Sequence, residues 1–294
     1  MAQKSYKQLN LNEVELEALA RIAKPKLYKH TANIVGYHRS RTLINGGSDF
    51  AGLREYSPGD EVRSINWRAS ARSNQFQVHQ YQQERGSRWF ICLDTSASMR
   101  FPNQQKWLQA LQISDALAYL LISAGNQVGL VAFNQAIDKF CPLGHGRQQY
   151  KKLHQLFDQI VPQKSGGDSL LHLCAPYIKQ SATVIVISDF LQTDFMQQGM
   201  DKLYHSGHQL HVLQTISPDE TKLAGDGQMS LEDCESGELM QIEFTAENRS
   251  IAELALNQHC HVLALRCAEK RINYSLAYSN RYWKDVLLEH ISRL

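Results

Sequence analysis

Three short polar runs in the sequence place carboxylates and hydroxyls directly after apolar segments typical of strands or after a glycine pair. In chain order they are Asp94-Thr95-Ser96-Ala97-Ser98, Asp168-Ser169 and Asp189. In open α/β sheets, ligands bind at the carboxyl ends of the strands. We therefore expect the three runs to meet at one edge of a sheet.

The residue types in these runs favour a hard metal ion. Two carboxylates with hydroxyls and water form an oxygen-only site, which suits Mg²⁺ or Mn²⁺ because these ions need few protein ligands and retain several waters. Asp94 and Asp189 would supply the charge, and Ser96 and Ser98 in a tight turn would supply hydroxyls. An incomplete shell leaves a position for an outside ligand, for which a carboxylate of a partner protein is a natural candidate. Each run alone could also be a turn or a helix cap.

The surrounding segments alternate between apolar strands and amphipathic helices. The pattern predicts strands at 89–96, 127–134, 183–190, 208–216 and 272–278, a short hairpin strand at 136–144, helices at 104–125, 147–161, 170–180, 196–207 and 246–270, a hairpin at 227–244 and a final helix. Such alternation predicts a doubly wound, mostly parallel α/β sheet with right-handed crossovers.

The N-terminal part has a different amino-acid composition. Residues 9–23 predict a short amphipathic helix that Pro25 limits, and residues 36–83 are rich in Gly, Ser, Arg and aromatics, which predicts an ordered segment of loops and strands. We therefore expect two parts: an N-terminal segment at 1–87, forming a small β-rich subdomain or extension, and an α/β domain at 88–294.

Composition excludes several classes of protein. The chain has 294 residues, of which 43% are hydrophobic and 20% charged, so it can bury a sizeable core. A net charge of +2 gives no reason to expect nucleic-acid or membrane-surface binding. Six singly spaced cysteines favour a reducing compartment. Without a signal peptide or a run of about 18 apolar residues, we expect a cytoplasmic protein with no membrane span.

Two charged groups outside the three runs have alternative interpretations. The arginines of the N-terminal part could either tie loops together through bidentate carboxylate pairs or form a surface for an acidic partner; they are Arg54, Arg63, Arg68 and Arg72. The stretch 219–243 holds eight acids against one lysine. Its simplest interpretation is a solvated face, and the alternative is a docking surface.

Several of these motifs resemble those of known protein families. The run DTSAS, the following helix, the GGDS loop and the strand end ISDF resemble a von Willebrand factor A domain with its metal-ion-dependent adhesion site. The preceding segment is similar to the signature of the bacterial domain-of-unknown-function-58 family: a Phe-x-x-x-Arg-x-Tyr run, a Pro-Gly-Asp turn, an Ile-x-Trp, an Ala-Arg and a terminal acid. Together these cover about residues 30 to 195.

The resemblance implies roles for particular residues. Asp94, Ser96 and Ser98 would be first-loop ligands, and Asp189 would act directly or through water. The family commonly places Thr after the paired glycines, whereas this chain has Asp168 and Ser169, so either Ser169 replaces the Thr hydroxyl or Asp168 adds a carboxylate. A second departure is Asn66, where the Ile-x-Trp motif usually carries Asp.

The resemblance also implies a function. We expect a non-enzymatic domain that binds Mg²⁺ or Mn²⁺ and uses the ion to bind a client protein that offers an acidic residue. A MoxR-type AAA+ ATPase is the implied partner, in a chaperone-like system that assembles or matures protein complexes. The alternatives are a metal-dependent hydrolase or phosphatase at the same strand ends, or a scaffold with a degenerate site.

Overall fold

The computed structural model describes residues 9, 11–33, 43–44, 49–58, 60, 62–73, 75–82, 86–163, 169–191, 193–222 and 227–293. The chain forms two compact units: a larger one from residues 1–32 and 87–294, and a smaller one from residues 33–86. The predicted site residues that follow strands all belong to the larger unit.

The larger unit is built on a six-stranded sheet in the order β11-β8-β7-β4-β5-β6. All neighbouring strands are parallel except β5 and β6. The strands are β4 (Arg88–Asp94), β5 (Gln127–Phe133), β6 (Ile137–Gly144), β7 (Thr183–Ser188), β8 (Gln209–Ile216) and β11 (Asn273–Tyr278). The β9 (Gly227–Glu232) and β10 (Leu239–Phe244) strands form a separate antiparallel hairpin.

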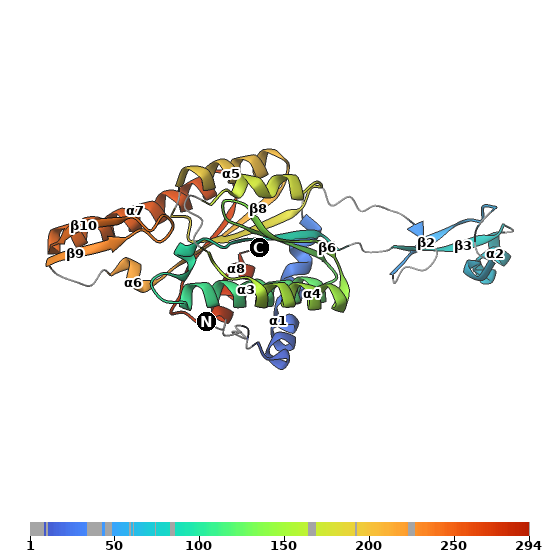
Figure 1. Ribbon diagram of the computed structural model, residues 1–294. Helices are drawn as coiled ribbons and strands as arrows, with labels where there is room; N and C mark the ends of the chain where they lie inside the picture. Colours follow the sequence, from blue (N-terminus) through green and yellow to red (C-terminus); the bar gives the residue numbers. More distant parts are fainter. Residues whose placement is uncertain are drawn as a thin grey trace. The chain divides into compact units, whose positions relative to one another are not determined.

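Helices cover both faces of this sheet (Figure 1). One face carries α1 (Glu13–Asn33), α3 (Gln105–Ser123), α4 (Gly146–Gln159) and α8 (Trp283–Ser292). The other carries the 3₁₀ helix η3 (Leu171–Tyr177), α5 (Thr193–His205) and α7 (Ala246–Glu269). Two short elements complete the unit: η2 (Ala97–Arg100) and α6 (Pro218–Thr221). A mostly parallel sheet between helices confirms the predicted α/β class.

The β4 strand shows why the sequence folds in this way. Trp89, Ile91 and Leu93 pack into the core on the α3 side, whereas Phe90 and Cys92 pack into the core on the η3 side. Side chains alternate between the faces of a strand, so a continuous apolar run is needed where helices cover both faces. The apolar run of β4 ends at Asp94, so this carboxylate lies at the carboxyl end of the strand.

The smaller unit holds a three-stranded antiparallel sheet in the order β1-β3-β2. Its elements are β1 (Leu43–Ile44), β2 (Asp49–Glu55), the 3₁₀ helix η1 (Val62–Ser64), α2 (Trp67–Ser73) and β3 (Gln77–Gln82). Phe76 makes edge-to-face contacts with Tyr56 and Trp67. The predicted segment of loops and strands is therefore a small sheet with one short helix.

The structure differs from the sequence-based expectations in three respects. The α1 helix continues past Pro25 to Asn33, so the expected helix end was wrong. The helix expected over 170–180 is shorter, a 3₁₀ helix over residues 171–177 that contains Pro176. The α1 helix also packs Leu16, Leu19 and Leu27 into the core of the larger unit, so it does not share a unit with the small sheet. Among the described helices, none is long and apolar enough to cross a membrane.

Candidate functional site

Asp94 lies at the centre of a buried hydrogen-bond network at the carboxyl end of β4. Its side chain is only 2% exposed. The Oδ1 atom accepts hydrogen bonds from the backbone N–H of Ser96 (3.0 Å) and from the hydroxyl of Ser169 (2.9 Å). The Oδ2 atom accepts one from the hydroxyl of Ser188 (2.6 Å), the last residue of β7. Two parallel strands and a loop thus deliver their polar groups to one carboxylate.

The Ser96 and Ser98 hydroxyls lie side by side in the turn after β4. Their Oγ atoms are 3.0 Å apart. Asn134, which follows β5, fixes this turn by donating from Nδ2 to the carbonyls of Thr95 and Gln163. The turn therefore keeps Ser96 beside the Asp94 carboxylate and the Ser98 hydroxyl beside that of Ser96.

Asp189 takes part in a buried ion-pair network that the sequence did not predict. The ammonium of Lys106, on α3, contacts Asp189 Oδ2 at 3.0 Å and Glu220 Oε1 at 2.7 Å. Lys106 is fully buried. Glu220 is fixed in turn because its Oε2 accepts a hydrogen bond from the backbone N–H of Ser217, as part of a capping box.

The electrostatics of the site favour an added positive charge. Burial, together with the negative charge of Asp189, raises the pKa of Asp94 to about 6. Burial opposes the charge of Lys106, but Asp189 and Glu220 outweigh it and raise the lysine pKa. Burial also raises the pKa of Glu220. One ammonium thus contacts two carboxylates, on Asp189 and Glu220, and no contact between it and Asp94 offsets the burial of that carboxylate.

A further carboxylate reaches the site from the β9–β10 hairpin. Glu235, in the turn between the two strands, accepts a hydrogen bond at Oε1 from the backbone N–H of Ser98 (2.9 Å). Its exposure is only 8%. The acidic stretch 219–243 is thus not uniformly the solvated face that was expected, because Glu235 and the Glu220 side chain are buried at the site.

The structure brings together most of the predicted site residues. Asp94, Ser96, Ser98 and Ser169 form one contiguous set, and Asp189 is close enough to perturb Asp94. Asp168 lies outside the described residues. The sequence analysis missed four participants: Ser188, Lys106, Glu220 and Glu235. For Lys106 a signal existed, because it is one of only two charged residues in the apolar α3 sequence.

The donor set suits a hard cation. It offers carboxylate and hydroxyl oxygens only, which matches the preference of Mg²⁺ and Mn²⁺. Within the described parts of the chain, no group of three or more His, Cys, Asp and Glu side chains could hold a metal ion. The oxygens near the Asp94 carboxylate are instead mainly serine hydroxyls, on Ser96, Ser98 and Ser169.

The arginines of the smaller unit divide into two groups. Arg54 forms a bidentate pair with Asp60, with both N–O distances at 2.6 Å, and this hydrogen bonding lowers the pKa of Asp60 to about 2. This pair confirms the structural interpretation for Arg54. The other three are exposed, and no described acid forms an ion pair with them; they are Arg63, Arg68 and Arg72.

Asn66 caps a helix. Its Oδ1 accepts a hydrogen bond from the backbone N–H of Ala69 (3.1 Å) at the start of α2. Asp and Asn are about equally good at this position. Asn66 can therefore cap the helix as well as the Asp that the motif usually carries, and this position needs no charge.

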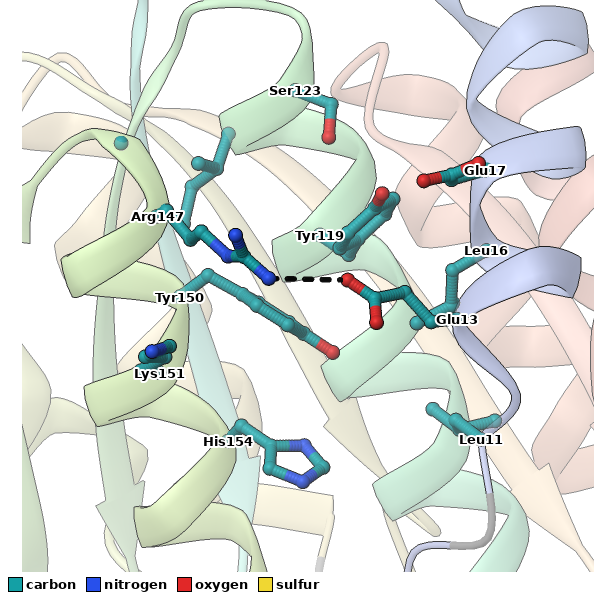
Figure 2. Close-up of a pocket in the computed structure, with 12 residues that line it drawn as sticks. Leu11, Glu13, Leu16, Glu17, Tyr119, Ser123, Arg147, Tyr150, Lys151 and His154 are labelled. Carbon is teal, nitrogen blue, oxygen red and sulfur yellow. Dashed lines mark ion pairs between the residues drawn. The ribbon is translucent and has the colours of Figure 1, made fainter.

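A separate pocket of about 670 Å³ lies between α1, α3 and α4. Figure 2 shows Arg147 of α4 paired with Glu13 of α1, at 3.6 Å, across this pocket. Beneath it, fully buried Asp115 of α3 accepts hydrogen bonds at Oδ2 from His154 Nδ1 (2.9 Å) and from the Tyr150 hydroxyl (3.3 Å). This second charged residue of α3 thus links α3 to α4, and its hydrogen bond raises the pKa of His154.

The fold and the site define an α/β protein with a cluster of carboxylates and hydroxyls at the carboxyl edge of a mostly parallel sheet. The family described as "Protein of unknown function DUF58" matches residues 52–260, and the chain belongs to this family.

Its relatives include uncharacterized proteins from mycobacteria. Rv1480 of Mycobacterium tuberculosis and Mb1516 of Mycobacterium bovis are each 28% identical over 203 residues, which is 66% of this chain and 63% of each relative. Uncharacterized protein YeaD of Bacillus subtilis is 23% identical over 141 residues, 46% of this chain and 33% of that protein. The chain thus spans less than two thirds of the length of these relatives.

Two solved structures show a weak likeness. A conserved hypothetical protein, BatB from Bacteroides thetaiotaomicron, is 16% identical, with 71% of this chain and 98% of that chain covered and a TM-score of 0.45. An aerotolerance-related membrane protein from Bacteroides fragilis is 15% identical, with 71% and 100% covered and a TM-score of 0.42. Both TM-scores are below 0.5, so these likenesses carry no conclusion about function.

Proposed function

We propose that the larger unit is a von Willebrand factor A-like domain that binds Mg²⁺ at the end of β4 and, through it, a carboxylate of a partner protein. Asp94 and the hydroxyls of Ser96, Ser98 and Ser169 would hold the ion. A bound ion would supply an open coordination position for an outside carboxylate. In this proposal the protein is an interaction module and not an enzyme.

The observation that carries the proposal is the environment of Asp94. A carboxylate that is 2% exposed, next to a second carboxylate, is costly to ionise, as its raised pKa of about 6 reflects. A divalent cation relieves both the burial and the repulsion. The three hydroxyls converge on the same place and add neutral ligands, so the site can hold the ion and still leave a position open.

Asp189 has a different role because Lys106 occupies its Oδ2 atom. Its Oδ1 accepts a long hydrogen bond from the backbone N–H of Leu191 (3.3 Å). Asp189 would therefore tune the charge of the site or act through a water molecule. The resemblance noted above extends the proposal to the partner, which would be a MoxR-type AAA+ ATPase working with a client protein.

Calorimetric titration of Mg²⁺ and Mn²⁺ tests the metal proposal. We expect saturable binding by the wild type and none by Asp94→Ala, with Asp201→Ala as a control because Asp201 pairs with Lys270 elsewhere in the unit. Equal binding by Asp94→Ala and wild type would contradict the proposal. A pull-down of a purified MoxR-type ATPase with Mg²⁺ and with EDTA then tests the partner, which should be retained only with Mg²⁺.

A further inference from the structure

The turn of the β9–β10 hairpin places a carboxylate directly on the loop that follows β4. Glu235 belongs to this turn, yet its partner Ser98 lies 137 residues earlier in the chain. The neighbouring Cys234 is half-buried, and its thiol senses the charges of Lys106 and Asp189. The turn, defined here as residues 233–238, therefore lies next to the candidate site.

The rest of the hairpin has few buried residues. Most of its strand residues are exposed, including Leu239 at 72% and Met240 at 66%. Its buried residues are Phe244, at the base next to α7, and Glu235, at the tip. The Glu235 contact therefore links the tip of the hairpin to the body of the unit.

The turn itself is well organised. Asp233 Oδ1 accepts hydrogen bonds from the backbone N–H groups of Glu235 (2.8 Å) and Ser236 (2.7 Å). Gly237 closes the turn with its N–H bonded to the Asp233 carbonyl (2.9 Å) and with a φ of +75°, which glycine adopts without strain. The turn can therefore move as one body while keeping the geometry that presents Glu235.

We propose that Glu235 is the in-chain occupant of the position that the partner's carboxylate takes, and that the partner presents a glutamate on a similar tight turn. The inference rests on the proposed function, because it concerns access to the same site. In this arrangement the hairpin covers the site, and a partner binds by displacing the turn. The chemistry of Glu235 and its turn thus indicates that of the partner: one glutamate on a short acidic loop.

Thiol labelling of Cys234 tests the covering role. We expect Glu235→Ala to raise the labelling rate of Cys234 by a maleimide about tenfold or more. Glu238→Ala, which removes an exposed acid from the same turn, should leave the rate unchanged. Removing a nearby carboxylate also lowers the Cys234 pKa, so rates should be measured from pH 7 to 9.5 and compared per thiolate. Equal thiolate rates in the three proteins would overturn the proposal.

A peptide added in trans tests the occupancy. The probe is a fluorescent peptide of residues 231–240 with Ser in place of Cys234. With Mg²⁺ present, we expect it to bind Glu235→Ala at least tenfold more tightly than wild type, whereas a peptide carrying Glu235→Gln should not bind. Equal affinity for the two proteins would overturn the inference. If Glu235→Ala raises the labelling rate of Cys234 but the peptide binds equally well without Mg²⁺, the hairpin does cover the site. That result would refute the metal-dependent function instead.

Discussion

Replacing Lys106 with Met tests the electrostatic account of the site. Lys106 is fully buried and contacts two carboxylates, on Asp189 and Glu220. Met keeps most of the apolar stem but removes the ammonium. Removing one partner from a buried ion pair typically costs about 3–5 kcal/mol, because a buried charge is left without compensation. We therefore expect the free energy of unfolding to fall by about 3–5 kcal/mol at pH 7.5.

The loss should depend on pH in a defined direction. Burial raises the pKa of Glu220, and the Lys106 ammonium opposes this rise. Without the ammonium the folded-state pKa of Glu220 rises further, so the folded state of the variant binds more protons than the unfolded state. The stability of the variant therefore rises relative to wild type as the pH falls from 7.5 to 5. In wild type, the raised Lys106 pKa keeps the lysine charged throughout this range.

Urea unfolding followed by circular dichroism measures both effects. Lys202→Met, an exposed site on α5, is the matched control and should change stability by less than about 0.5 kcal/mol. The double variant Lys106→Met/Glu220→Gln should recover part of the loss because it removes one of the two uncompensated charges. A loss below about 1 kcal/mol, or one that is the same at pH 5 and 7.5, would refute the reasoning.

Three further predictions concern other contacts. The folded-state pKa of Asp94 is raised to about 6, so metal-free wild type should lose stability as the pH rises from about 4 to above 6. Asp94→Asn should not show this loss, and urea unfolding across the same pH range measures the difference. Asp115→Asn should lower the His154 pKa, which NMR titration measures. In wild type the raised pKa stabilises the folded state at low pH, and this stabilisation is lost as the pH rises through that pKa; the variant should lack it. Asn66→Ala should destabilise the smaller unit by about 1 kcal/mol, whereas Asn66→Asp should not; thermal unfolding separates them.

The sheet could be predicted because its apolar runs are determined locally. The β4 and β7 segments are buried on both faces, so their sequences are continuously hydrophobic and end at a polar residue. The end of α1 could not be predicted in this way. Proline has no backbone N–H donor and is unfavourable inside a helix, yet α1 continues past Pro25. Apolar residues on both sides of Pro25 pack into the core and stabilise the helix; they are Leu16, Leu19, Ala23 and Leu27.

The candidate site could be predicted only where its residues follow strands. Asp94, Ser96, Ser98 and Ser169 come together because parallel strands end at the same edge. Glu235 arrives from a hairpin that is distant in sequence, and no local pattern distinguishes it from the seven other acids in 219–243. The two charges of α3 are different, because buried charges in an apolar helix must find polar partners, and both Lys106 and Asp115 do so.

The buried charges of the site also connect its parts energetically. Asp94, Asp189, Glu220 and Glu235 have buried side chains, and the Lys106 ammonium contacts two of them, Asp189 and Glu220. A cation bound beside Asp94 would stabilise the folded state by RT ln(1 + [L]/Kd), about 2.7 kcal/mol at a concentration of 100 Kd. It would also attract Glu235 or a carboxylate that replaces it. Metal binding and closure of the hairpin should therefore strengthen each other, and a partner must offer a carboxylate that competes with Glu235 for the same ion.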